Sequence, residues 1–99
     1  MDIKSTVNGN RMEMKLSGKL DTVSVPDFEE KTQTLPKGIT EVVLDMSELL
    51  YVSSAGLRAI LVLLQDLEEA DGTLYVRNVP QIVQDVFEVT GFDLLLQKL

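Results

Sequence analysis

The chain has 99 residues and carries 16 acidic against nine basic side chains, a formal net charge of −7, and at this length we expect one domain, residues 1–99, with a single core. The acidic excess argues against binding of nucleic acid or of an anionic membrane surface, because both partners are bound by clustered Lys and Arg. The sequence contains neither cysteine nor histidine, which excludes disulfides, thiolate chemistry and the most common general base and metal ligand.

Hydrophobic residues make up 44% of the chain and charged residues 25%, as in folded globular proteins. The longest uninterrupted apolar run, Ala59 to Leu64, is far shorter than the roughly 20 residues that a membrane span needs. The first residues lack the basic start and apolar stretch of a secretory signal. We therefore expect a cytoplasmic protein without direct membrane insertion.

A β-hairpin is predicted at the start of the chain. Met12, Met14 and Leu16 alternate with charged residues. This period of two is typical of a strand with one solvent-exposed face. Residues 3–7 form a weaker alternating pattern and predict the partner strand. The Asn-Gly-Asn segment at residues 8–10 supplies residue types that adopt the positive φ of a tight hairpin turn.

A helix and a buried strand are predicted next. Ser24 precedes Pro26 and Asp27, a pattern that favours a helix start, and the Leu-Pro-Lys-Gly segment at 35–38 stops the helix. Residues 41–46 contain three consecutive apolar residues, two of them β-branched. Such a run is typical of a strand that is covered on both faces, as in a parallel α/β sheet.

The strongest helix signal begins at the Ser-Ser-Ala-Gly segment at 53–56 and runs to about Ala70, where Asp71-Gly72 provides a stop. At 100° per residue, one side of this helix collects large aliphatic residues and predicts its core face. The residues predicted on that face are Leu57, Ile60, Leu61, Leu64 and Leu67.

The remaining elements are a short strand at 73–77, a helix that begins at Asn78-Val79-Pro80 and ends at Gly91, and a last strand within 92–96. The inner face of that helix is predicted to carry Ile82, Val83, Val86 and Phe87. The predicted fold class is therefore α/β, with a mixed, mostly parallel sheet of four to five strands that opens with an N-terminal β-hairpin. The helices are expected mainly on one face of that sheet.

An unusual stripe lies on the polar side of the second helix. Ala55, Arg58 and Val62 share this side, with Ala59 at its margin. An arginine among small apolar groups suits the centre of an interface. The alternative is that single exposed apolar residues are ordinary on protein surfaces.

Two adjacent serines, Ser53 and Ser54, stand at the start of the same helix. One serine suffices as an N-cap, whose hydroxyl accepts a hydrogen bond from a free backbone amide. The second hydroxyl is then left over, and a phosphate on it would meet unpaired amides and the positive end of the helix dipole. Either a capping role alone or a phosphorylation switch is compatible with this pair.

Other chemistry has weaker signals. The sequence has no phosphate-binding loop, dinucleotide fingerprint or EF-hand loop. Asp21 and Asp45 follow or end predicted strands and could approach each other to bind Mg²⁺, although isolated carboxylates at such places are more often solvated or capping residues.

Three segments together resemble a known family. They are Gly-Lys-Leu-Asp at 18–21, Val-Val-Leu-Asp-Met-Ser at 42–47 and Tyr-Val-Ser-Ser-Ala-Gly-Leu at 51–57. In this combination the chain resembles the STAS domain, and specifically the small bacterial anti-sigma factor antagonists. The similarity extends over nearly the whole chain and is most specific between residues 42 and 57.

The resemblance implies a partner-switching protein that is not an enzyme and has no cofactor. An unphosphorylated antagonist of this kind binds an anti-sigma factor, a serine kinase of the GHKL ATPase fold that supplies the ATP, and thereby releases the sigma factor. Phosphorylation ends the binding, and a PP2C-type phosphatase restores it. The family pattern places the phosphoacceptor at Ser54, with Ser53 where aspartate is frequent. The implied partner-binding residues are Asp21, Ser53, Ala55, Gly56, Arg58, Ala59 and Val62.

Two alternatives remain open from the sequence. Similar domains serve as non-switching STAS subunits of transporter or sensory assemblies. An enzyme that uses Asp21 and Asp45 with Mg²⁺ and a nucleotide is the other alternative.

Overall fold

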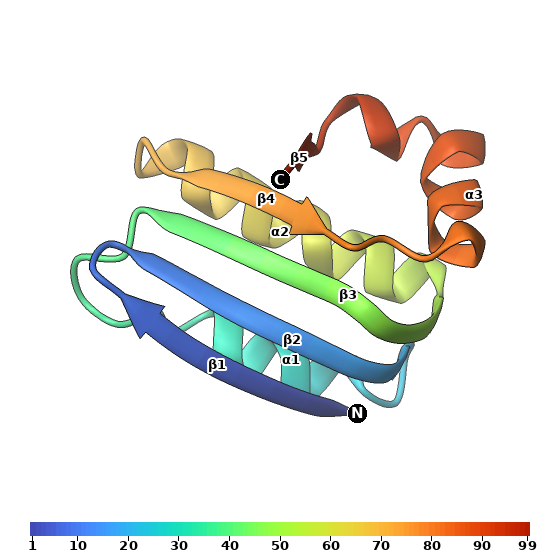
Figure 1. Ribbon diagram of the computed structural model, residues 1–99, viewed down its shortest axis with the longest axis horizontal. Coiled ribbons are helices and arrows are strands. Elements are labelled where there is room, and N and C mark those ends of the chain that lie inside the picture. The colour runs from blue at the N-terminus through green and yellow to red at the C-terminus, as the bar shows by residue number, and fades with distance from the viewer.

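The computed structural model describes residues 1–99 as a five-stranded sheet with helices packed against it (Figure 1). The elements are β1 (Asp2–Asn8), β2 (Arg11–Leu20), α1 (Val25–Thr32), β3 (Glu41–Val52), α2 (Ser54–Glu69), β4 (Thr73–Arg77), α3 (Gln81–Thr90), the 3₁₀-helix η1 (Phe92–Leu94) and β5 (Gln97–Lys98). The strand order is β1-β2-β3-β4-β5, with β1 antiparallel to β2 and every other pair parallel. The predicted α/β fold class is confirmed.

The N-terminal hairpin forms as its alternation predicts. Asn8 pairs with Arg11, so Gly9 and Asn10 make a two-residue connection, and Gly9 has a φ of +64°. Glycine adopts this angle without steric cost, since it has no Cβ. The apolar residues of β2 are buried, while the residues between them are half-buried or exposed.

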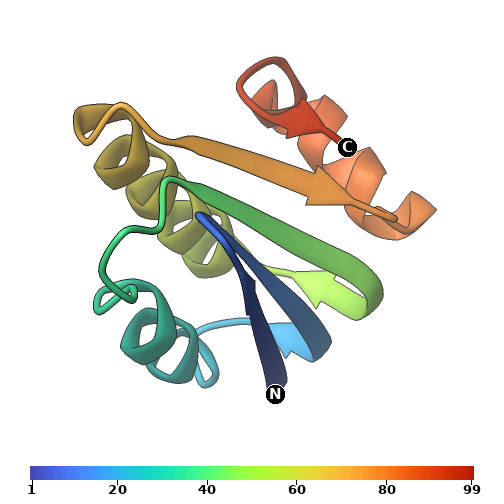
Figure 2. The ribbon, with the colours of Figure 1, turned by 60° about the vertical axis from the view of Figure 1, so that its left-hand side comes forward.

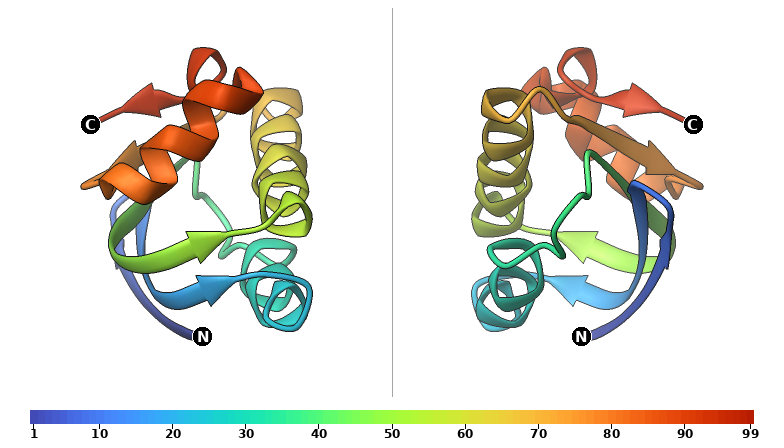
Figure 3. Two further views of the ribbon diagram at one scale, coloured as in Figure 1. Left: turned by 90° about the vertical axis from the view of Figure 1, so that its right-hand side faces the viewer. Right: turned by 90° about the vertical axis from the view of Figure 1, so that its left-hand side faces the viewer.

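The two faces of the sheet differ in character. Helices α1 and α2 lie side by side on one face (Figures 2 and 3), and α3 lies at the carboxyl end of β4 (Figure 1). Phe28 of α1, Ile60 of α2 and Phe87 of α3 are fully buried in the core. On the opposite face, Arg77 of β4 contacts Glu13 at 2.6 Å and Asp45 at 3.5 Å. No helix is both long and apolar enough to cross a membrane.

The two aspartates considered for Mg²⁺ lie far apart. Asp45 is paired in register with Lys15, whereas Asp21 follows β2 six positions beyond Lys15, which is roughly 20 Å along a strand. Asp45 is instead within 3.5 Å of Arg77 and accepts a 3.0 Å hydrogen bond from the backbone amide of Ser47. Burial alone would raise the pKa of Asp45, but the hydrogen bonds from Ser47 and Asn78 and the positive charge of Arg77 together outweigh this and lower it. The structure therefore does not bring these two carboxylates together for Mg²⁺.

Strand β3 is longer than predicted and runs to Val52. Two register shifts, between Lys15 and Ser17 and between Gly18 and Lys19, keep β2 paired with it as far as the Leu20–Val52 pair. Irregularities of this kind bend a strand and increase the local twist of the sheet. As a result β2 and β3 end together, and α2 begins directly beside them.

Three other expectations are wrong in detail. Helix α1 ends at Thr32, so the predicted stop at 35–38 lies in the following loop. Residues 92–96 do not form a strand, because Phe92–Leu94 make a 3₁₀ turn after Gly91 and only Gln97–Lys98 reach β4. On α3, Val83 and Phe87 are buried, but Ile82 is exposed.

Candidate functional site

The site lies where β2 and β3 end and α2 begins. The backbone amide of Ser53 donates a 2.9 Å hydrogen bond to the carbonyl oxygen of Leu20, which ties the start of the helix to the end of β2. The amide of Leu57 then donates to the carbonyl of Ser53 at 2.9 Å and closes the first helical turn. The position of the helix start is therefore set by the sheet.

The two adjacent serines have separate positions. Ser53 is the N-cap, with an extended backbone (φ −86°, ψ 175°), and its hydroxyl oxygen accepts a 3.2 Å hydrogen bond from the amide of Gly56. Ser54 is the first residue of α2, is exposed, and its hydroxyl has no hydrogen-bond partner within the chain. The capping role therefore leaves the hydroxyl of Ser54 free and open to an approaching molecule.

Loss of the cap is expected to destabilise the protein while loss of the neighbouring hydroxyl is not. Ser53→Ala removes the acceptor of the Gly56 amide, and N-cap replacements of this kind cost about 1 kcal/mol of unfolding free energy. Ser54→Ala serves as the matched control, because the exposed hydroxyl makes no internal bond. Urea denaturation measures both, and equal stability of the two variants would contradict the assignment of Ser53 as the cap.

The electrostatics at the start of α2 favour a negative group. The first turn contains no acidic residue, so the partial positive charge of the helix N-terminus has no carboxylate beside it. Asp21, next to Leu20, is turned toward its own loop, where its Oδ1 accepts the amides of Val23 and Ser24, both at 3.1 Å. Hydrogen bonds from Ser24 and Val23 hold the pKa of Asp21 below its usual value. Asp21 thus stays ionised and orders the β2–α1 loop.

Two of the residues expected at a partner surface are buried. Gly56 and Ala59 face inward, which corrects the expectation that they contact a partner. A Cβ on Gly56 would lie 2.5 Å from the carbonyl oxygen of Leu20, so only glycine allows this close approach of α2 to β2. Because these small residues sit against the sheet, Leu63 is buried as well, although it was not predicted in the core.

This packing turns the aliphatic side of α2 partly outward. Leu57 and Leu61, both predicted in the core, are only half-buried. They lie three and seven positions after Ser54 on the helix, so the three residues share one side. The signal that would have indicated this is the pair of small residues Gly56 and Ala59, which mark the side of closest approach.

The exposed stripe on α2 is present. Ala55 is half-buried, Arg58 is exposed and Val62 is 37% exposed. Arg58 makes no ion pair or side-chain hydrogen bond within the chain, so its charge is available to a partner. We call Ser54, Ala55, Leu57, Arg58, Leu61 and Val62 the α2 face.

Two exposed apolar residues that sequence analysis did not single out lie at the same end of the sheet. Val23, in the loop after β2, is 87% exposed, and Leu50, near the end of β3, is 62% exposed. Leu50 is the extra residue of β3, since Gly18 pairs with Leu49 and Lys19 with Tyr51. Ser54 shares its side of α2 with the half-buried Leu57 and Leu61 and with Arg58, which has no ion-pair partner.

Comparisons with known proteins agree with this architecture. The family model described as "Mlab, STAS domain" matches residues 3–97. The BtrV protein of Bordetella bronchiseptica, named as a candidate anti-sigma factor antagonist, is 36% identical over 78 residues, which cover 78% of this chain and 67% of BtrV. The anti-sigma-B factor antagonist of Staphylococcus aureus is 29% identical over 92 residues, which cover 92% of this chain and 85% of that protein.

Solved structures show the same fold. The anti-sigma factor antagonist SpoIIAA in its unphosphorylated form has a TM-score of 0.77 and 19% identity over 99% of this chain and 87% of its own. The phosphorylated form of SpoIIAA from Bacillus has a TM-score of 0.77 and 20% identity over 99% of this chain and 91% of its own. At these identities the likeness concerns the fold.

Proposed function

This chain belongs to the STAS domain family, and we propose that it is an anti-sigma factor antagonist whose binding is switched by phosphorylation of Ser54. The observation that carries the proposal is the exposed, unbonded hydroxyl of Ser54 at the first position of α2, beside a serine that already caps the helix. Relatives that cover most of this chain are named as antagonists of anti-sigma factors, which supports the same role here.

The partner in this proposal is an anti-sigma factor that is also a serine kinase of the GHKL ATPase fold. The kinase brings the ATP, so the antagonist itself needs no cofactor and performs no catalysis. The contacts on this chain are the α2 face together with Ser53 and Asp21, and a PP2C-type phosphatase in the same cytoplasm removes the phosphate. SpoIIAA, which shares this fold, has been solved in a phosphorylated form, and this supports modification of the present chain.

A phosphate on Ser54 changes binding without requiring a change of fold. It adds about −1.5 to −2 charges next to a helix N-terminus, which tolerates an anion. At the same time the phosphate lies beside Leu57 and Leu61, whose half-buried side chains would be covered in the complex. A charge enclosed there without a basic partner is unfavourable, so the modified chain leaves the kinase.

A second candidate is a STAS subunit that stays bound in a transporter or sensory assembly and does not switch. The matching family model is described as "Mlab, STAS domain", a domain that such subunits also carry. The two functions differ in the partner and in the need for a free Ser54 hydroxyl.

The release of a sigma factor tests the proposal. Unmodified chain added to a purified complex of the anti-sigma factor and sigma factor from the same organism is expected to free the sigma factor, as followed by size-exclusion chromatography. Arg58→Ala and Val62→Asp are expected to reduce release, whereas Lys37→Ala, in the loop before β3, serves as a control. Failure of the folded chain to release the sigma factor, with stable binding to a transporter ATPase instead, would favour the second candidate.

A further inference from the structure

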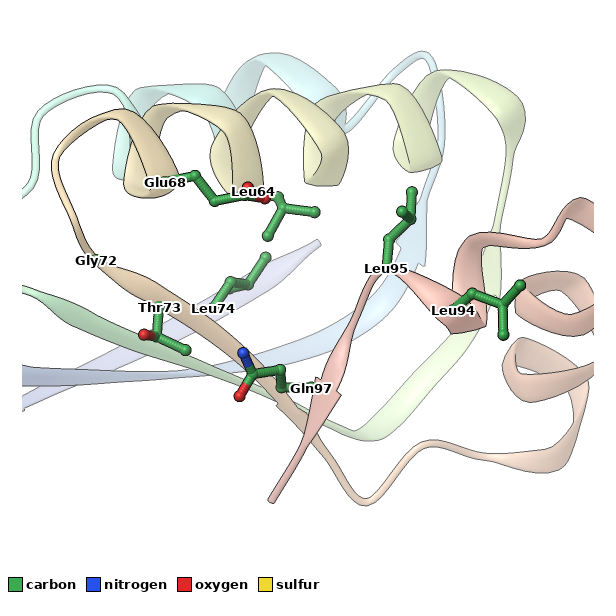
Figure 4. A pocket seen from close by; sticks show the side chains of 8 residues that line it. All are labelled: Leu64, Glu68, Gly72, Thr73, Leu74, Leu94, Leu95 and Gln97. Carbon is green, nitrogen blue, oxygen red and sulfur yellow. The ribbon is translucent and has the colours of Figure 1, made fainter.

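A second unpartnered surface lies at the opposite end of α2 from Ser54. Strand β5 pairs only with Tyr75 and Val76 of β4, so the first residues of β4, Thr73 and Leu74, have no strand neighbour on this side. A cavity of about 370 Å³ lies between this open edge and the carboxyl-terminal half of α2 (Figure 4). The α2 residues that line it, Leu64 and Glu68, lie 10 and 14 positions after Ser54, which is about 15 to 21 Å along the helix.

Four of the eight residues that line this cavity are leucines. The side chains of Leu64 from α2, Leu74 from β4 and Leu95 from the segment before β5 point into the space between helix and sheet edge (Figure 4). Leu64 and Leu74 are buried, whereas Leu95 is 54% exposed. Leu94, which is 90% exposed, points away from the other leucines. An apolar side chain that entered here would complete the burial of Leu95.

One acidic residue lines the cavity, and three more lie near it in the chain. Glu68 borders it, and Asp66, Glu69 and Asp71 lie on the same final turn of α2 or directly after it. None of these four carboxylates takes part in an ion pair, and the last turn of α2 has no basic residue. The partial negative charge of the helix C-terminus adds to their potential. The surface therefore attracts a cationic group.

We infer that this groove binds an extended, basic segment of a second protein. The segment adds a strand to the open edge of β4, places an apolar side chain between Leu64, Leu74 and Leu95, and sets a Lys or Arg against Glu68. Strand addition satisfies the backbone groups of a sheet edge. A purely apolar small molecule would leave that edge and Glu68 unmatched, and a second copy of this chain would bring the same acidic residues and a charge of −7.

The test uses a short peptide and the full chain labelled with ¹⁵N. The peptide acetyl-Lys-Val-Leu-Val-Lys-amide is titrated while backbone amide shifts are followed by NMR. We expect saturable shifts at Gly72, Thr73 and Leu74 and over residues 95–97, and at least tenfold weaker binding of the peptide with Glu in place of both Lys residues.

Two pairs of matched variants locate the contact. Leu95→Asp is expected to weaken peptide binding at least tenfold, whereas Val89→Asp, on α3 and outside the cavity lining, changes it less than twofold. Glu68→Lys is expected to have a similar effect to Leu95→Asp, with Glu30→Lys on α1, away from the cavity, as the control of equal charge change. All four positions are exposed, and the amide spectrum verifies that each variant is folded.

Several results would overturn the inference. They are the absence of saturable shifts, shifts confined to the α2 face, and self-association of the peptide-free chain through the amides of residues 72–74. Octanoate that fills the cavity without being displaced by the peptide would also contradict it. The proposed function is tested separately, because Leu95→Asp and Glu68→Lys should release the sigma factor as the unmodified chain does.

Discussion

Replacement of Ser54 by aspartate is expected to weaken binding to the anti-sigma factor by at least about 100-fold, or about 2.7 kcal/mol. Ser54 is exposed and lies on the same side of α2 as the half-buried Leu57 and Leu61. A partner that covers these leucines also encloses residue 54. A charge that is enclosed without a counter-charge costs about 3–5 kcal/mol. This cost exceeds the expected loss of binding free energy, which leaves room for partial hydration of the aspartate in the complex.

Isothermal titration calorimetry with the purified anti-sigma factor measures this effect. Ser54→Ala is the control, since it removes the hydroxyl without adding charge and should bind within about threefold of the unmodified chain. The same variant should take up no phosphate from the kinase and ATP, as determined by mass spectrometry. Undiminished affinity of Ser54→Asp, or unaltered phosphorylation of Ser54→Ala, would show that another residue operates the switch.

Gly56→Ala is expected to destabilise the protein by about 2 kcal/mol, a typical cost of overpacking a closely packed site. The added Cβ would lie 2.5 Å from the carbonyl oxygen of Leu20, 2.9 Å from Cγ of Leu20 and 3.1 Å from Cγ1 of Val52. The Leu20 oxygen is held in place by the amide of Ser53 at 2.9 Å. Helix α2 must therefore move away from β2, and this loss outweighs the gain of about 1 kcal/mol in helix propensity.

Thermal unfolding measures the effect, and a decrease of roughly 10 °C in Tm is expected for a domain of this size. Gly91→Ala provides a comparison, because Gly91 has a φ of +75° but no atom within 4 Å of the added Cβ. That variant reports backbone strain alone, which costs about 1 kcal/mol. A Gly56→Ala protein as stable as the unmodified chain would mean that α2 is not held against Leu20 as described.

Local patterns predicted much of the fold because they depend on neighbouring residues. The alternation of Met12, Met14 and Leu16 and the three-residue apolar run at 42–44 specified strands, and both are present. The end of β3 was not predictable, because residues 47–52 remain in the sheet only through register shifts against β2. Pairing across 30 residues of chain has no local signature.

The candidate site was predicted in part. The helix start at Ser53 and Ser54 follows from residue types alone, because a cap depends on the next three residues. We predicted the core side of α2 from its large aliphatic residues. The side that faces the core in the structure is rotated about the helix axis relative to that prediction. Gly56 and Ala59 take the position of closest approach, which leaves Leu57 and Leu61 half-buried.

By itself the sequence determined the element types as far as Gly91, the parallel character of the central strands and the serine pair at the start of α2. These follow from hydrophobic period, backbone preference and capping chemistry, each of which acts within a few residues. The tertiary structure alone decided which side of α2 remains outside and where β4 has an unpaired edge. Those outcomes depend on how closely separate elements approach, and that distance is set by side chains far apart in the sequence, such as Gly56 and Leu20.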